Sequence, residues 1–247
     1  MINLKNKSEI EKLYSAGQIV KDTLFLVEEH IKPGISTLEL DKIAEDYIRS
    51  KNAIPGFKGL YGFPATLCIS IDDEVVHGIP SERILKKGQI VSVDVGSIYQ
   101  EFYGDHAKTF IVHDTSDDNK KLIDVTRECL MLGIEQMKVG NRIGDIGYTI
   151  QKYAESKGYG VVRDLVGHGI GRKLHEDPQV PNYGEKGTGP IIENGLCLAI
   201  EPMINLGTEQ VYTKDDNWTM CTADGKPSAH FEHSVAVIDN KIRILTA

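Results

Sequence analysis

Cysteine is scarce in this sequence, and its few cysteines form no metal-binding or disulfide pattern. Cys68, Cys129, Cys197 and Cys221 stand far apart without a C-x-x-C pair, which suits neither a structural zinc site nor a dense disulfide framework. We expect all four to be reduced and mostly packed. A chain of 247 residues buries roughly 70 to 75 % of its unfolded surface, so it needs neither a disulfide nor a metal in order to fold. Any metal ion that it binds is therefore expected to serve chemistry.

Long apolar runs and basic clusters are also missing. No stretch approaches the ~20 apolar residues that span a membrane, and residues 1–9 contain no apolar signal-peptide core. The 36 acidic residues outnumber the 28 basic ones, giving a formal charge of −8, so phosphate backbones find few cationic partners. We therefore expect a cytoplasmic protein with no membrane anchor and no direct nucleic-acid specificity.

Two parts of the sequence look like one helical unit written twice. Apolar residues recur at helical spacing over residues 10–31, after a possible capping box at 8–11, and a second box at 36–39 opens another helix. Residues 121–138 and 143–157 repeat this pair of helices. Helical hairpins share composition, so the helices alone are weak evidence for a repeat.

The predicted strands strengthen the repeat. His77-Gly78-Ile79 recurs as His168-Gly169-Ile170, and the runs 88–94 and 195–201 each begin with a turn glycine and end on an acid. A second acid follows in each half, at Asp105 and Glu232. The pattern predicts one α+β catalytic domain over residues 1–247, with pseudo-symmetric halves at about 8–115 and 116–247. A site would lie in the cleft between them.

Four carboxylates and one histidine are the candidate metal ligands. A tight turn near residues 99–100 predicts that Asp94 lies directly opposite Asp105, with Cβ atoms about 5 Å apart, which is unfavourable unless a cation lies between them. Glu201 and Glu232 would repeat this pair, and His168 adds an imidazole. Such a set suits two divalent ions, of Mn²⁺, Fe²⁺, Co²⁺ or Zn²⁺.

Simpler interpretations exist for each of these residues. A lone acid at the end of a strand is usually a turn or cap residue, and a lone histidine such as His168 is more often a hydrogen-bonded core residue. Agreement between the two halves favours the metal site. By contrast, Asp72-Asp73-Glu74 is predicted to be a solvated turn.

The motifs around these residues closely resemble those of the type I methionine aminopeptidases, dinuclear metallo-aminopeptidases of the creatinase/aminopeptidase family with its "pita-bread" fold. The resemblance runs from about Ser8 to the C-terminus. It rests on seven motifs: His77-Gly78-Ile79-Pro80, Val93-Asp94-Val95, Gly104-Asp105, Gly167-His168-Gly169-Ile170-Gly171, His175-Glu176-Asp177-Pro178, Glu201-Pro202-Met203 and Glu232-His233. It implies an antiparallel sheet covered by helices, with a central site. Phe57, Leu60 and Leu174 depart from common type I patterns.

The resemblance also implies roles for individual residues. The positions that match family ligands of two metal ions are Asp94, Asp105, His168, Glu201 and Glu232. Those that match catalytic histidines are His77 and His175, and Glu201 would act as a base as well as a ligand. The candidates for substrate binding are His77, His175, Leu60, Phe63, Cys68 and Trp218.

The implied activity is removal of an N-terminal methionine when the second residue is small, through attack by a metal-bound hydroxide. The expected substrates are nascent polypeptide N-termini, with transient ribosome association, and we expect a monomer. Two other interpretations stay open. One is an X-Pro peptidase of the same fold, and the other is a metal-free binding protein that reuses it. The second would be expected to have lost ligands, and this chain keeps all five.

Overall fold

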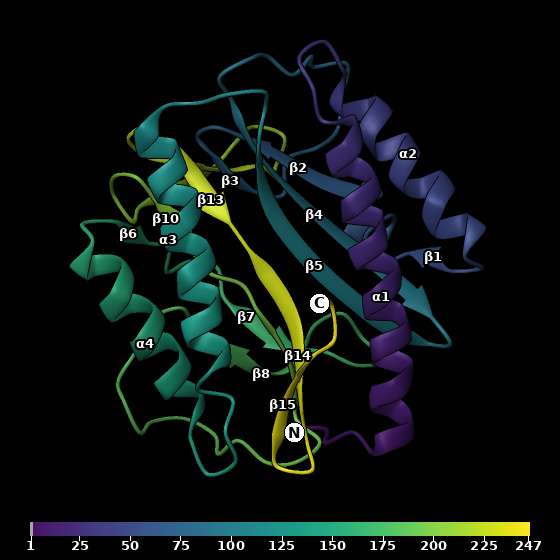
Figure 1. Cartoon of the computed structure of the whole chain (residues 1–247), viewed down its shortest axis with the longest axis vertical. Helices are drawn as coiled ribbons and strands as arrows, with labels where there is room; N and C mark the ends of the chain where they lie inside the picture. Colours follow the sequence, from purple (N-terminus) through teal and green to yellow (C-terminus); the bar gives the residue numbers. More distant parts are fainter. Residues whose placement is uncertain (1) are drawn as a thin grey trace.

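A curved nine-stranded sheet covered by two pairs of helices forms the body of the protein (Figure 1). The computed structural model describes residues 2–247. The helices are α1 (Lys7–His30), α2 (Thr37–Ser50), α3 (Asp117–Ile134) and α4 (Ile143–Ser156), with a 3₁₀ turn, η1 (Leu60–Gly62). Within residues 2–247, no helix is apolar enough over a sufficient length to cross a membrane.

The sheet runs in the order β1 (Ile54–Pro55), β4 (Ile90–Tyr99), β5 (Phe102–Ile111), β14 (Glu232–Ile238), β9 (Cys197–Ile200), β7 (Gly167–Gly169) and β8 (Glu176–Val180). Off this path, β2 (Leu67–Ile71) pairs with β4, and β15 (Lys241–Ile244) pairs with β14. One smaller sheet joins β13 (Ser228–His230), β10 (Met203–Asn205) and β6 (Gly160–Val161). Another joins β11 (Val211–Thr213), β12 (Met220–Thr222) and β3 (Glu74–Val76).

The helix boundaries agree with the sequence pattern except at the start of α1 and at both ends of α3. The capping box of α1 is formed by Asn6 and Glu9, so the box predicted at 8–11 was wrong. Asparagine is as good an N-cap as serine, and Glu9 already occupies the third helical position. The box at Ser36 is confirmed. Helix α3 covers 117–134 where 121–138 was predicted, because Ser116 caps it and acidic residues fill its first turn.

The register of the β4–β5 hairpin differs from the prediction by two residues. Asp94 lies opposite Ala107, and Asp105 lies opposite Gly96. The turn is formed by Gln100 and Glu101, which both have positive φ (50° and 69°), as a two-residue type I′ loop requires. A shift of two residues keeps side chains on the same face. The two acids are therefore diagonal neighbours on one face instead of direct partners.

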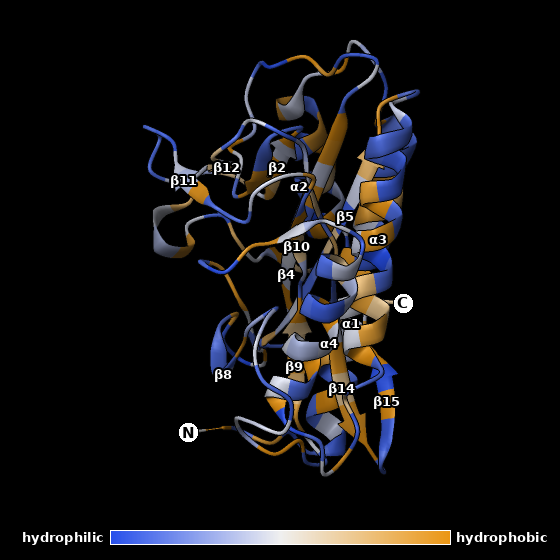
Figure 2. Ribbon diagram, turned by 90° about the vertical axis from the view of Figure 1, so that its left-hand side faces the viewer, coloured by the Kyte–Doolittle hydropathy of each residue, from blue (hydrophilic) through white to orange (hydrophobic). Residues whose placement is uncertain are grey.

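The two faces of the sheet have different roles. Val91, Val93 and Val95 of β4 pack into the apolar cluster beneath α1 and α2, together with Val20 and Leu40. Because side chains alternate along a strand, Asp94 points to the opposite face. Figure 2 shows α3 and α4 on one side of the sheet and β8, β11 and β12 on the other. The site therefore lies on the face that is not covered by the helices.

A seam between β5 and β14 joins the strands of the two repeated parts. Glu232 lies opposite Ala107 and His233 opposite His106. The Ser234 hydroxyl donates to the Asp105 carbonyl at 2.8 Å. This seam brings the acids of the first hairpin beside those that follow β9 and begin β14.

Candidate active site

A cavity of about 160 Å³ lies at the seam. It holds every residue that the sequence predicted as ligand, catalytic group or substrate contact. Its lining consists of Phe57, Leu60, Tyr61, Phe63, Cys68, His77, Asp94, Asp105, His168, Leu174, His175, Glu201, Trp218 and Glu232. Acids and imidazoles therefore share one cavity with an apolar, partly aromatic group of side chains.

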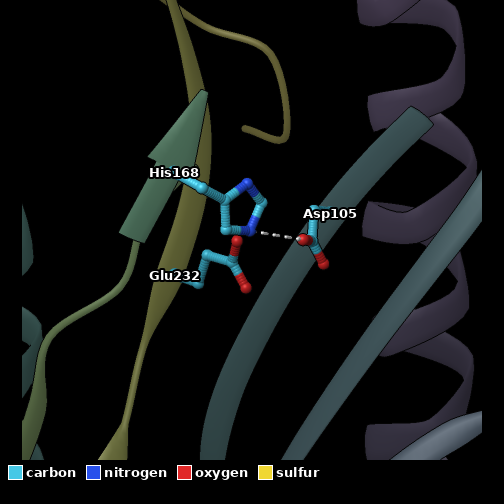
Figure 3. Close-up of side chains that lie close together, drawn as sticks. All are labelled: Asp105, His168 and Glu232. Carbon is cyan, nitrogen blue, oxygen red and sulfur yellow. Dashed lines mark ion pairs between the residues drawn. The ribbon is translucent and has the colours of Figure 1, made fainter. Parts of the chain in front are cut away.

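Three of the predicted ligands converge from three different strands. Asp105 lies on β5, His168 on β7 and Glu232 at the start of β14, and their side chains point toward a common centre (Figure 3). One potential ligand atom from each lies within 4.8 Å of the other two. All three residues are buried. This is the spacing expected of atoms that surround a single cation.

His168 is held in the tautomer that a metal ligand needs. Its Nδ1 lies 2.9 Å from the carbonyl oxygen of Gly169, and a carbonyl only accepts, so Nδ1 carries the proton. The lone pair is then on Nε2, which lies 3.6 Å from Asp105 Oδ2 and 3.5 Å from Glu201 Oε1. Burial and the nearby His175 lower the His168 pKa to about 4. The imidazole is therefore neutral near pH 7 and directs Nε2 at the acids.

The carboxylates have too little positive charge around them to be ionised together. Burial raises the pKa of each of three carboxyl groups well above the ordinary value for its residue type, and neighbouring acids raise it further. These groups are Asp94, Glu201 and Glu232. Burial raises the pKa of Asp105 to about 7, although hydrogen bonds with Glu232 and Asp94 oppose this. Like charges that lie close together disfavour one another.

Unpartnered oxygens give an independent test of whether the residues fit a metal. Asp94 Oδ1, Asp105 Oδ1 and Glu232 Oε1 are buried and have no hydrogen-bond partner. Leaving a buried acceptor unpaired costs on the order of 1–3 kcal/mol. Divalent cations satisfy such oxygens and neutralise the acids at the same time, so the donor set fits divalent metal.

Metal binding should release protons in a pH-dependent way. A carboxyl whose folded pKa is raised, as for Asp105 from 3.8 to about 7, costs stability as the pH rises through that window. Metal removes this cost, so its stabilising effect should grow from pH 5 to pH 8. His168 is already neutral over this range and changes it little. Unfolding midpoints with chelator and with Mn²⁺, together with calorimetric proton release, measure the effect. A metal-induced shift that is larger at pH 5 than at pH 8 would contradict it.

His77 is placed by an unusual piece of backbone. It follows β3 with φ of 60°, and a Cβ on the next residue, Gly78, would lie only 2.0 Å from the carbonyl oxygen of Ile69. Only glycine allows this approach to β2, and the turn directs His77 into the cavity. Burial and His175 lower the His77 pKa to about 4, so its imidazole is neutral near pH 7.

His175 lies between the acids and an exposed aromatic ring. Its ring contacts His168 edge-to-face, with centroids 4.5 Å apart, and stacks against Tyr61 at 6.0 Å. Burial lowers the His175 pKa. Tyr61 was missed by the sequence analysis. Its position in the sequence between Leu60 and Phe63, which were both predicted to contact substrate, was the signal that could have identified it as a cavity residue.

The remainder of the cavity is apolar. Phe63 and Trp218 meet edge-to-face with ring centroids 5.1 Å apart, and Leu60 and Leu174 belong to the same apolar cluster. Burial raises the pKa of the Cys68 thiol well above its usual value, so it is protonated and packs as a small apolar group. An unbranched, sulfur-containing side chain suits such a pocket.

Comparisons with known proteins agree with this geometry. The chain matches metallopeptidase family M24 over residues 11–239. It is 52 % identical over 247 residues to the methionine aminopeptidase of Clostridium acetobutylicum, covering 100 % of this chain and 99 % of that protein.

Solved structures give the same result. The crystal structure of methionine aminopeptidase from Rickettsia prowazekii superposes with a TM-score of 0.98 at 41 % identity, covering 100 % of both chains. An Xaa-Pro dipeptidase from Bacillus anthracis is similar in fold alone, with a TM-score of 0.79 at 23 % identity over 98 % of this chain and 61 % of that one. The predicted α+β pita-bread fold is confirmed. The chain belongs to metallopeptidase family M24 and, within that family, to the type I methionine aminopeptidases.

Proposed function

We propose that this chain hydrolyses the first peptide bond of polypeptides that begin with methionine and continue with a small residue. The observation that carries the proposal is the single cavity in which acids, neutral imidazoles and an apolar pocket meet. The family membership and the full-length similarity to methionine aminopeptidases support it. Residues 1–247 would act as one catalytic domain with pseudo-symmetric halves.

Divalent metal would be held by Asp94, Asp105, His168, Glu201 and Glu232. We propose two ions, of Mn²⁺, Fe²⁺, Co²⁺ or Zn²⁺, because the four carboxylates that line one cavity carry more negative charge than one divalent ion neutralises. When bound, such ions lower the pKa of water from about 15.7 to roughly 7 and so supply a nucleophile at neutral pH.

Side chains of the protein would transfer the protons and orient the scissile peptide bond. Glu201 would take the proton of the attacking water on a carboxylate oxygen and return it to the leaving amine, because its carboxylate lies in the same cavity as the other candidate ligands. His175 would donate to the carbonyl oxygen as negative charge develops there. His77 would orient the scissile amide nitrogen. Leu60, Phe63, Cys68 and Trp218 would hold the methionine side chain and exclude water.

The substrates would be nascent N-termini in the cytoplasm, reached by a monomer during transient ribosome association. This setting follows from the substrate class, because methionine at a free N-terminus is characteristic of newly made chains. The acidic balance of the sequence gives no support for direct nucleic-acid specificity.

Selectivity for the second residue tests the proposal. Bulk beside His77 should displace the carbonyl, and a misplacement of ~1 Å can cost about 10²-fold. Metal-loaded protein should therefore cleave Met-Ala-Ser about 10²-fold faster in kcat/KM than Met-Lys-Ser, and N-acetyl-Met-Ala-Ser should resist cleavage. Equal rates on the first two peptides, or cleavage of X-Pro peptides without preference for methionine, would instead favour the X-Pro peptidase. Absence of any hydrolysis would favour the binding protein.

A further inference from the structure

The hairpin β11–β12 contributes Trp218, at its tip, to the wall of the cavity. Trp218, the one tryptophan in the sequence, lies in the tip and contacts Phe63. The Lys214 N–H donates to the Thr219 carbonyl at 2.8 Å. The Asp216 carboxylate accepts the N–H groups of Trp218 at 2.9 Å and Thr219 at 2.8 Å. These bonds make residues 214–219 a unit, so anything that holds one end of the tip also places Trp218.

The tip is joined to the body of the protein on both sides. On one side, β12 pairs with β3, although its register shifts between Met220 and Cys221. On the other side, β11 is largely solvent-exposed. There the tip is joined to the body by an ion pair, in which Lys214 Nζ lies 2.6 Å from Glu74 Oε1. Glu74 belongs to β3, the strand that leads directly into His77. One ion pair thus connects the tip that carries Trp218 to β3, the strand that His77 follows.

The Glu74 carboxylate is buried and held by three donors. The solvated turn predicted for residues 72–74 was wrong for this residue, because its side chain is only 6 % exposed. Its Oε2 accepts the N–H of Ile71 at 2.8 Å, and its Oε1 accepts Arg83 Nη1 at 2.7 Å. A buried carboxylate with three donors has little freedom to move. It fixes the position that Lys214 reaches.

We propose that Glu74 and Lys214 are positioning residues that hold Trp218 against Phe63 and thereby set the selectivity of the pocket for the first side chain of the substrate. The proposal rests on the proposed function for what the pocket binds. The position of Trp218 itself does not depend on that function. Neither residue lines the cavity, so both act through Trp218.

The decisive variant is Lys214→Met, because Glu74 keeps Arg83 and the Ile71 N–H when Lys214 is removed. The fold therefore does not depend on Lys214, whose side chain is 38 % exposed. Lys226→Met is a matched control, since Lys226 lies between β12 and β13 and its Nζ is 3.8 Å from Asp224 Oδ2. Lys214→Arg keeps the charge and should restore the wild-type behaviour.

Trp218 fluorescence gives a readout that is independent of catalysis. With one tryptophan in the chain, acrylamide quenching reports on this wall alone. We expect quenching to increase about twofold in Lys214→Met and not in the control, because a partly exposed ion pair shifts such an equilibrium by only a few-fold. Salt at 1 M, where the screening length is about 3 Å, should increase quenching of the wild type and leave Lys214→Met unchanged.

Kinetics then test the consequence for selectivity. The ratio of kcat/KM for Met-Ala-Ser over Leu-Ala-Ser should fall about three- to fivefold in Lys214→Met, mainly through KM for the methionine peptide. The amount of metal bound by Lys214→Met should equal that of the wild type. Quenching and selectivity that match those of Lys226→Met would overturn the proposal. If the wild type cleaves neither peptide, the proposed function fails, and the quenching comparison alone decides the role of Lys214 and Glu74.

Discussion

Removing divalent metal should abolish hydrolysis of Met-Ala-Ser, and Glu232→Gln should prevent its restoration. Glu232 is 2 % exposed and has an unpartnered Oε1. In the metal-free wild type, burial and the neighbouring acids make its charge unfavourable. A neutral amide of the same shape removes that charge. We therefore expect metal-free Glu232→Gln to be more stable at pH 8 than metal-free wild type, while losing metal binding and activity.

Asp145→Asn is the matched control for this prediction. Asp145 is also a buried carboxylate, but it lies at the start of α4, where it accepts the N–H groups of Arg142 at 2.7 Å and Gly187 at 2.8 Å. Its replacement should cost on the order of 0.5–2 kcal/mol and leave metal binding intact. Metal content by elemental analysis, thermal unfolding with and without chelator, and peptide cleavage measure the three effects. Full turnover of metal-free wild type would exclude a metal-dependent reaction.

The candidate site was predictable because its residues come from strands whose ends carry a repeated pattern. The predicted turn and the alternation of side chains placed Asp94 and Asp105 on one face, and a register error of two residues leaves both side chains on that face. The error arose at Gln100 and Glu101, which adopt positive φ without the Asn-Gly or Asp-Gly sequence that normally marks such a turn. The alternation of side chains along the strands therefore predicted the face that carries the acids, whereas the residues of the turn did not predict the register of the hairpin.

Contacts between distant segments could not be predicted from the sequence. Glu74 looked like part of a solvated turn because its neighbours Asp72 and Asp73 are acidic. Its carboxylate is paired with Arg83 and with Lys214, which lies 140 residues further along the chain. The stacking of Tyr61 on His175 was unpredictable for the same reason, because His175 belongs to the other half of the chain. Long-range pairing of single side chains leaves no periodic signal.

His175→Ala should separate catalysis from metal binding. The ring of His175 contacts that of His168 edge-to-face at 4.5 Å, and it lines the cavity without belonging to the group of converging ligand atoms. Loss of a donor to the developing oxyanion typically costs ~10² to 10³-fold in kcat. We expect His175→Ala to keep its metal and its fold and to lose at least about 10²-fold in kcat on Met-Ala-Ser.

His168→Ala should behave in the opposite way, losing metal first and activity as a consequence, because Nε2 of His168 faces Asp105 and Glu201. His113→Asn is the control, since His113 is exposed and has φ of 70°, which asparagine tolerates. It should change neither property. Metal content and single-turnover rates distinguish the three variants. If His175→Ala loses metal while His168→Ala keeps it, the roles of the two histidines are reversed, and Nε2 of His168 must then contact the substrate instead.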